Sequence, residues 1–404
     1  MKSSYDYDVI IAGGGPGGSS AAIHLALRGA RVLLAEQKTF PRQKLCGEFI
    51  SPECVIHFER LGVAAQMLSA DPTRLTETIF YSRAGRKVSV PSTWFGTGGA
   101  ALGLSRAEMD ERLLRRAAEV GVTVLEDAPV VDLVFENEAV CGVDLKNNGT
   151  KISYRAPLTI DATGRIRALA RCVKRQEKRD LWQRASLVAF KAHFEETRVA
   201  SGACEIYFYR GGYGGLSNIE GGLSNLCFIA SARDVRACGA DANRAMREIV
   251  CENVRAAEAL ADAQIRSPWL AVSLDGFGRR KLAPAKGLIA VGDAASFIDP
   301  FTGSGMLMAL ESGELAARVI ADHSGAMKTE GEFSELAADY REAYVRKFNA
   351  RLRLCSLMRR AAFFPGLAEL AIRSFGASDR FRRRITRATR SGSQKHESPL
   401  VSPK

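Results

Sequence analysis

The sequence predicts an α/β protein with a Rossmann-like domain, a second domain built on an antiparallel sheet, and C-terminal helices. Three observations support this fold class. A strand, a glycine-rich turn, a helix and a second strand follow one another between residues 7 and 36. Short apolar segments separated by Gly, Asn and Ser occupy residues 187–230, which is typical of an antiparallel sheet. A further strand and helix at 287–320 resemble the first pattern, so we expect the Rossmann-like domain to be discontinuous.

The segment 7–36 carries a dinucleotide-binding pattern. Gly13, Gly15 and Gly18 stand at G-x-G-x-x-G spacing after an apolar run, and the second strand ends in Glu36. Gly13 allows a tight turn, Gly15 leaves room for a pyrophosphate, and Gly18 lets the helix pack close to the sheet. The helix N-terminus attracts phosphates. Glu36 can accept hydrogen bonds from ribose hydroxyls, and an acid at this position disfavours a 2′-phosphate.

Composition bounds the function classes. The 404 residues are 46% hydrophobic and 25% charged, which suits two packed globular domains. The first residues lack an apolar signal segment and no run of 18 apolar residues occurs, so we expect a cytoplasmic protein. Nine scattered cysteines without C-x-x-C, and five scattered histidines, predict reduced thiols and no metal site. The net charge of +12 comes without a nucleic-acid motif, so nucleic acid is not an expected partner.

The segments after the second strand contain a candidate ligand loop. Residues 40–52 (FPRQKLCGEFISP) form a loop in which Arg42 and Lys44 could meet phosphates. Cys46 and Gly47 would let a flat ring pass beside the backbone, although a plain surface loop is the alternative.

The helix expected at 107–120 follows Ser105, which forms a capping box with Glu108. Arg106 is unfavourable for the dipole at this helix start. It therefore either pairs with a phosphate or is an ordinary exposed arginine.

Residues 53–70 are expected to form one helix with Leu61, Met67 and Leu68 on its buried side, and 75–90 to form a hairpin.

A strand at 158–160 ends in Asp161, where a ligand-facing acid is expected. The stretch 211–222 looks like a glycine-rich connection that includes Tyr213, and 242–263 looks helical.

The segment 287–320 is the second candidate ligand site. Its strand ends in Asp293, and a loop shaped by Pro300, Gly303 and Gly305 leads into a helix that starts at Met306. A second helix N-terminus at a ligand site, far in sequence from the first, points to a long cofactor held at both ends by one domain.

Three stretches together carry a family resemblance: GGGPGG with Glu36, PRQKLCGEFISP, and GDAASFIDPFTGSGMLMALESGELAA. The chain resembles flavoproteins of the p-hydroxybenzoate hydroxylase-like fold, and within them the geranylgeranyl reductase group, over about residues 5–350. The resemblance implies a Rossmann-like FAD-binding domain, an antiparallel-sheet substrate domain and FAD as cofactor. The matching cofactor positions are Gly13, Gly15, Gly18 and Glu36 at the ADP half, Arg106, Val130 at the adenine, Asp293 at the ribityl chain, and Cys46, Gly47, Gly305 and Met306 beside the flavin.

Two departures bear on the reaction. Hydroxylases of this fold carry Asp-Gly where this chain has Asp161-Ala162, which argues against their kind of direct NADPH use. The segment 212–217 keeps Tyr213 but lacks the tryptophan and Phe-Pro of the reductases, so the substrate stays open. The tryptophan-rich motif of the related halogenases has no match, so halogenation is not favoured.

The expected function is FAD-dependent reduction of a carbon–carbon double bond in a hydrophobic, isoprenoid or polyketide-like substrate. The alternatives are a monooxygenase acting on an aromatic or alkene, and a non-catalytic flavin- or lipid-binding protein. Cys46 and Tyr213 are the catalytic candidates. The expected partners are a hydrophobic small molecule and an electron donor, which is NAD(P)H, ferredoxin or a flavin reductase.

The expected domains are an FAD-binding domain at 1–170 and 276–330, with residues near 75–100 able to join the substrate side, and a substrate domain at 171–275. Helices at 331–380 and a basic disordered tail at 381–404 complete the chain. The arginine-rich apolar stretch 352–375 is either a helix pair packed on the substrate domain or an interfacial segment that places the protein on the inner face of a membrane.

Overall fold

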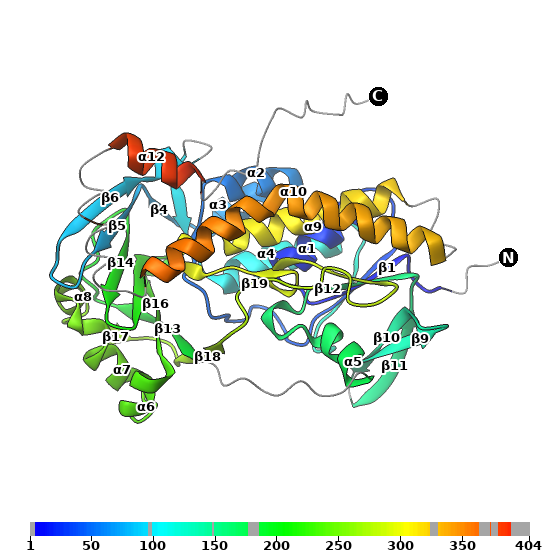
Figure 1. Ribbon diagram of the computed structural model, residues 1–404, viewed down its shortest axis with the longest axis horizontal. Coiled ribbons are helices and arrows are strands. Elements are labelled where there is room, and N and C mark those ends of the chain that lie inside the picture. The colour runs from blue at the N-terminus through cyan, green and yellow to red at the C-terminus, as the bar shows by residue number, and fades with distance from the viewer. Residues whose placement is uncertain are drawn as a thin grey trace.

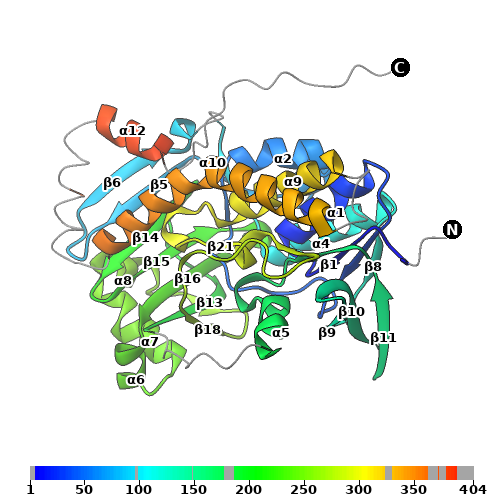
Figure 2. The same cartoon turned by 45° about the vertical axis from the view of Figure 1, so that its right-hand side comes forward.

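The computed structural model describes residues 5–95, 99–147, 149–176, 186–323, 330–362, 372 and 379–388. These residues form two lobes, one around a parallel sheet and one around a larger sheet. The long helix α10 (Glu330–Ala362) runs across both lobes (Figure 1), and the view turned by 45° shows the same arrangement (Figure 2). The α/β fold class predicted from the sequence is confirmed.

The first lobe contains a five-stranded sheet in the order β20-β12-β1-β2-β8, in which every neighbouring pair is parallel. Its strands are β1 (Val9–Ala12), β2 (Val32–Ala35), β8 (Thr123–Leu125), β12 (Leu158–Asp161) and β20 (Leu288–Ala290). Because β20 follows the strands of the second lobe in sequence, the first lobe is built from two separate stretches of chain.

Both faces of the parallel sheet are covered, which explains why its strands are apolar throughout. Ile11 and Leu34 face the helices, whereas Ile10 and Leu33 face a small antiparallel sheet, as alternation along a strand requires. The helices are α1 (Pro16–Ala26), α4 (Arg106–Glu119) and α9 (Gly305–Asp322), and the small sheet consists of β9 (Val130–Glu136), β10 (Ala139–Asn147) and β11 (Thr150–Arg155).

Small residues hold the start of α1 against α9. A Cβ atom on Gly313 would lie 2.4 Å from the backbone oxygen of Gly17 and 2.8 Å from the backbone nitrogen of Ala21. The Ser20 hydroxyl donates to the backbone oxygen of Leu310 at 2.8 Å. The two helices that begin beyond the carboxyl edge of the sheet are therefore fixed directly to each other.

The second lobe contains an eight-stranded sheet in the order β17-β13-β16-β15-β14-β5-β6, with β18 also paired to β13. The pair β5–β14 is parallel and the others are antiparallel. The strands are β5 (Glu77–Tyr81), β6 (Lys87–Pro91), β13 (Leu187–Glu195), β14 (Ala203–Tyr209), β15 (Gly212–Asn218), β16 (Ser224–Ser231), β17 (Gln264–Ile265) and β18 (Leu270–Leu274). The hairpin expected at 75–90 thus pairs with strands of the second lobe.

The helices α6 (Ala232–Ala237), α7 (Ala242–Glu248) and α8 (Val254–Ala259) cover the outer face of this sheet. Its other face looks toward the first lobe. The remaining elements are α2 (Glu53–Leu61), α3 (Ala64–Ser69), α5 (Ala168–Gln176), α12 (Asp379–Ala388), β3 (Phe49–Ile50), β4 (Thr73–Leu75), β7 (Ala101–Gly103), β19 (Gly278–Arg279) and β21 (Ser296–Phe297).

The helix expected at 53–70 is two helices, α2 and α3. Gly62 ends α2 in a left-handed conformation, with φ of +72°. Leu61 and Met67 are buried as expected, but Leu68 is 61% exposed, because the interruption between the helices means that α3 does not continue the helical spacing of α2.

Two expectations for the second lobe are wrong. Residues 212–218 form the strand β15, which pairs on both sides, although their glycines suggested a connection. The helix expected at 242–263 is split into α7 and α8. Asn253 starts α8 by accepting hydrogen bonds from the backbone N–H groups of Arg255 and Ala256.

The expectation of a disordered tail from residue 381 is wrong at its start, because residues 381–388 belong to α12. Arg382 fixes this helix by donating to the backbone oxygen of Ser89 at 3.0 Å. Residues 389–404, and 363–371 and 373–375 of the stretch 352–375, lie outside the described residues. No helix in the described part of the chain is long and apolar enough to cross a membrane.

Candidate active site between the two lobes

A cavity of about 870 Å³ lies between the lobes, large among ligand pockets, which span about 300–1,000 Å³. Residues from the glycine turn after β1, the loop 42–49, the start of α9 and the inner face of the large sheet line it. The expected site residues on its wall are Gly13, Gly15, Glu36, Cys46, Gly47, Arg106, Val130, Tyr213, Asp293, Gly305 and Met306.

Gly18 is the expected site residue that does not line the cavity. A Cβ atom on Gly18 would lie 1.9 Å from the backbone oxygen of Gly13. The absence of a side chain at Gly18 therefore lets α1 pack directly against the end of β1. Gly13 itself has φ of +108°, which favours glycine. A Cβ atom on Gly15 would find only guanidinium nitrogens of Arg42 and Arg106, each 3.9 Å away.

Three cations face the open side of the glycine turn. Arg106 is buried and donates to both carboxylate oxygens of Asp110, at 2.7 and 2.6 Å. Burial alone would lower the pKa of Arg106, but Asp110 outweighs burial, so the pKa is raised. Arg42 Nη1 lies 3.2 Å from Asp110, yet Nη1 and Nε of Arg42 are buried without a hydrogen-bond acceptor among the described residues.

Lys44 is the third cation. Its side chain projects into the cavity, where surrounding protein and the charges of Arg106 and Arg42 lower its pKa. Because like charges are held together there with unsatisfied donors, the pocket has the electrostatic character of an anion site.

Glu36 is fixed by backbone donors. Its Oε2 atom accepts from the N–H of Gly14 at 2.9 Å, and Oε1 accepts from the N–H of Lys38 at 3.0 Å. These bonds leave lone pairs on both oxygens, so the carboxylate at the cavity wall can also accept hydroxyl donors.

The other end of the cofactor region is formed by Asp293 and the start of α9. The carboxylate of Asp293 lies at the cavity wall, and its burial raises its pKa although Arg106, Lys44 and Arg165 act against burial. Gly305 and Met306 are the first residues of α9 and line the same cavity. A carboxylate and a helix N-terminus are therefore presented together.

A buried charge cluster supports the Cys46 loop from the second lobe. Lys191 Nζ lies 2.5 Å from Glu48 Oε1, and His193 Nε2 lies 2.7 Å from Glu48 Oε2. The backbone N–H of Arg106 also donates to Glu48 at 2.8 Å. Burial alone would raise the pKa of Glu48, but His193 and Lys191 outweigh it, so the pKa is lowered and the carboxylate is charged.

Cys46 lies between this cluster and the cavity. Its sulfur accepts from the N–H of Glu48 at 3.4 Å, and its backbone oxygen accepts from Asn225 at 3.1 Å. The loop that carries Cys46 and Gly47 is thus anchored to β16 as well as to the first lobe, and both residues face the cavity.

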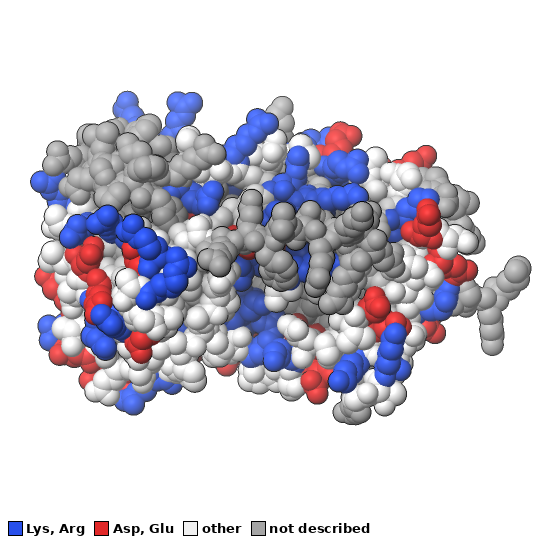
Figure 3. Space-filling model, turned by 60° about the horizontal axis from the view of Figure 1, so that its bottom comes forward, with Lys and Arg blue, Asp and Glu red and all other residues white. Residues whose placement is uncertain are grey.

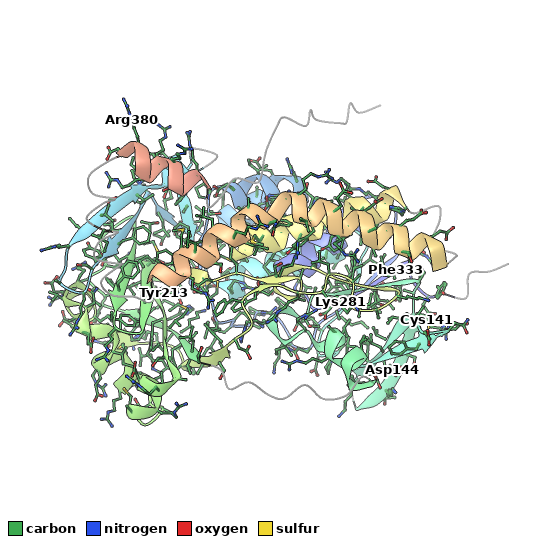
Figure 4. All side chains as sticks on the ribbon, viewed as in Figure 1. Cys141, Asp144, Tyr213, Lys281, Phe333 and Arg380 are labelled. Carbon is green, nitrogen blue, oxygen red and sulfur yellow. The ribbon has the colours of Figure 1, made fainter. Side chains whose placement is uncertain are left out.

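Tyr213 lies on β15, in the eight-stranded sheet of the second lobe (Figure 4). Its hydroxyl donates to Oδ1 of Asp299, which also accepts from the N–H of Phe301 at 3.0 Å. Burial and Asp299 raise the pKa of Tyr213, and burial raises the pKa of Asp299. Asp299 Oδ2 is buried without a hydrogen-bond partner among the described residues.

The part of the cavity that faces the large sheet is apolar. Cross-strand register places Ile206 beside Phe80, and Phe80 beside Val88, in one row. The apolar lining residues from this sheet include Phe80, Val88, Val90, Ala189, Ile206, Phe208, Ile229, Leu270, Ala271, Val272 and Leu274. In the same row, Gly215 offers no side chain, as suits a strand approached closely by a ligand.

Sequence reasoning misplaced one acid and missed one cluster. Asp161 was expected to face the ligand, but it is buried and accepts from Thr163 and Ala170, so it stabilises the turn instead. Glu48, Lys191 and His193 were not singled out. Glu48 lies in the loop 40–52, but its partners Lys191 and His193 belong to the other lobe, so no local sequence spacing links them to Glu48.

These residues fit FAD. The open cradle at Gly15 and the unsatisfied donors of Arg42 suit a pyrophosphate. Glu36 and Asp293 offer acceptors for hydroxyl groups at two separate places on the wall.

A family model described as an FAD binding domain matches residues 6–325. The chain is 26% identical to menaquinone reductase of Mycolicibacterium smegmatis, over 91% of this chain and 88% of that one. It is 27% identical to digeranylgeranylglycerophospholipid reductase of Methanocella arvoryzae, over 80% of this chain and 79% of that one. A solved flavin-dependent brominase shares the fold, with a TM-score of 0.77, 22% identity and 96% coverage of both chains.

The resemblance to geranylgeranyl reductases found in the sequence is confirmed by the similarity to digeranylgeranylglycerophospholipid reductase, and FAD is confirmed as the cofactor. The matched residues cover most of the chain and both ends of the cofactor region. The chain belongs to the FAD binding domain family and is an FAD-dependent oxidoreductase.

Proposed function

We propose that this oxidoreductase reduces a carbon–carbon double bond in a long hydrophobic substrate, isoprenoid in character. The observation that carries the proposal is the continuous cavity, in which the cofactor-facing residues lead directly to the apolar wall of the large sheet. The similarity of the chain to a menaquinone reductase and to a digeranylgeranylglycerophospholipid reductase supports the proposal. A wall of Phe, Val and Ile offers a polyprenyl chain burial worth about 25 cal/mol per Å² of apolar surface.

When bound, FAD supplies hydride chemistry at its ring. The chain's own residues bind, orient and exclude water. Arg42 and Arg106 would hold the pyrophosphate, Asp293 the ribityl hydroxyls, and Cys46 with Gly47 would line the flavin side. We prefer a packing role for Cys46.

Tyr213 is our candidate for proton delivery to the second carbon. It lines the cavity, and Asp299 fixes its hydroxyl. Burial and Asp299 raise the pKa of Tyr213 above its usual value of about 10, so its hydroxyl keeps its proton near neutral pH at the place where the apolar wall begins.

The experiment is anaerobic reoxidation of the reduced protein by polyprenyl alkenes, in the native chain and in Tyr213→Phe. We expect the variant to bind FAD normally and to reoxidise at least about 100-fold more slowly, the usual scale for a lost general acid. Tyr209→Phe is the matched control, because its hydroxyl donates to the backbone oxygen of Ile229 and it does not line the cavity. Equal rates in all three proteins would remove Tyr213 from the mechanism.

We also propose that the substrate enters from a membrane surface. Leu354, Leu357 and Met358 of α10 line the cavity, and Leu357 is 66% exposed. The helix α12 contributes Thr386 to the same cavity and carries the exposed side chains of Arg383 and Arg384. Exposed apolar residues and exposed arginines on helices that line one cavity suit an anionic lipid surface. Flotation with anionic vesicles should weaken in R383E/R384E, and unchanged flotation would contradict this route.

A further inference from the structure

Six cations lie close to one wall of the cavity, and one of them, Arg165, lines it. Three follow β12, one ends β19 and two follow β19, so they come from distant parts of the sequence. They are Arg165, Arg167, Arg171, Arg279, Arg280 and Lys281, and together they are called the basic rim below. Arg171, Arg279, Arg280 and Lys281 are exposed, and Arg165 and Arg167 are half-buried.

The basic rim is held by carbonyl groups rather than by carboxylates. Arg167 Nη2 donates to the backbone oxygen of Lys281 at 3.1 Å. Arg165 donates to the backbone oxygen of Ser273, and Arg280 to that of Gly276. None of the six forms an ion pair with an acid in the described part of the chain. Their charges are therefore positioned but not neutralised.

Three acids near the basic rim offset its charge only in part. Asp161 is buried and engaged by Thr163 and Ala170. Asp293 at the cavity wall and exposed Asp275 act on Arg165, whose pKa burial nevertheless lowers. Burial lowers the pKa of Arg167, and the charges of Arg280 and Arg171 add to the lowering against the effect of Asp161. The cations thus repel one another, which leaves a site for external negative charge.

An apolar residue lies among these cations and at the cavity. Ile166 is 49% exposed, and it lines the cavity together with Arg165 and Gly164. Figure 4 places Lys281 on the segment after β19, on the side of the molecule that faces the viewer. When the bottom of the molecule comes forward, Lys and Arg side chains are visible at several places on that face, some of them near its middle (Figure 3).

We propose that the basic rim is the docking surface of a small acidic electron-carrier protein that reduces the bound FAD. The charges complement an acidic partner, and exposed Ile166 gives an apolar centre next to the cofactor-bearing cavity. A one-electron carrier, such as a [2Fe–2S] ferredoxin, donates a single electron to the FAD each time it docks. Two carriers are oxidised, and two protons are taken from water, for each FAD reduced by two electrons.

The test measures binding of a plant-type [2Fe–2S] ferredoxin to the FAD-loaded protein by calorimetry at low and high salt, without substrate. We expect binding at low salt that weakens as salt rises. We expect the triple variant R171E/R280E/K281E, whose residues do not line the cavity, to bind at least about tenfold more weakly. The charge-matched control is R210E/R236E/R247E, on exposed arginines of the second lobe.

Binding that is absent in the native protein at low salt, or equal in the native and triple-variant proteins, would overturn the proposal. So would a loss of NADPH affinity in the triple variant with ferredoxin binding unchanged, which would assign the basic rim to a nucleotide. The inference rests on FAD reduction, not on the alkene. Salt-sensitive ferredoxin binding with no alkene reduced would contradict the proposed substrate and leave the docking surface standing.

Discussion

At the scale of single residues, Arg42 carries the sharpest signal for phosphate binding. Its Nε and Nη1 atoms are buried, and no acceptor among the described residues satisfies them, while its guanidinium faces Gly15. We expect Arg42→Gln to weaken FAD binding about 10- to 100-fold, because a hydrogen bond to a charged group contributes about 1.5–3 kcal/mol. Titration of apoprotein with FAD measures this. Arg83→Gln, at an exposed position, should leave the affinity unchanged.

His24 is expected to make the protein sensitive to mild acid. Its buried Nε2 has no hydrogen-bond partner in the described chain, and burial lowers its pKa from 6.5 to about 4. The unfolded chain takes up this proton near pH 6.5 and the folded chain only near pH 4. Stability present above pH 6.5 is therefore lost as the pH falls toward 4, by about 3 kcal/mol.

Denaturant midpoints at several pH values between 7 and about 4 test this, and His24→Gln should flatten the profile in that window. Glu314 beside His57 acts in a lower window. Its pKa is lowered to about 2, so its contribution is lost only as the pH falls below 4.5. If the denaturant midpoint of His24→Gln fell with pH above 4.5 as steeply as that of the native protein, the role of His24 would be contradicted.

At the scale of elements, the crossing of α1 and α9 depends on Gly313. A Cβ atom there would lie 2.4 Å from the backbone oxygen of Gly17, and neither backbone can move without disturbing the cofactor region. We expect Gly313→Ala to lower stability by about 1–3 kcal/mol, as overpacking usually does, and to lower the temperature at which flavin fluorescence appears. Asp322→Ala, on the exposed end of α9, should change neither.

The elements also show what the sequence could predict. The turn after β1 and the start of α9 were found because their glycines, acids and apolar runs are local signals. The strand β15 was missed because Gly212, Gly214 and Gly215 have poor strand propensity, and pairing with β14 and β16 overrides it. Asp161 was misassigned because local spacing does not show which donors a carboxylate will meet after folding.

At the scale of the whole molecule, the Glu48–Lys191 pair joins the lobes across the active site. These residues lie 143 positions apart, so no spacing rule links them. Removing one partner leaves a buried charge, and we expect Glu48→Gln or Lys191→Met each to cost about 3–5 kcal/mol. The double variant should cost less than the sum, measured as a coupling energy from unfolding midpoints.

The exposed pair Arg198–Asp262 is the control for this cycle. Both side chains are more than half exposed, and surface pairs contribute about 0–1 kcal/mol. A coupling for Glu48–Lys191 as small as that of the control would mean that the pair does not hold the lobes together.

The central claim is that the cavity between the lobes reduces a hydrophobic alkene, and product mass tests it most directly. The reduced, FAD-loaded protein is mixed with a polyprenyl alkene, once without oxygen and once in air, and the product is weighed by mass spectrometry. The account predicts a product heavier by two hydrogens that forms without oxygen. A product heavier by one oxygen atom, formed only in air, would contradict it and identify a monooxygenase.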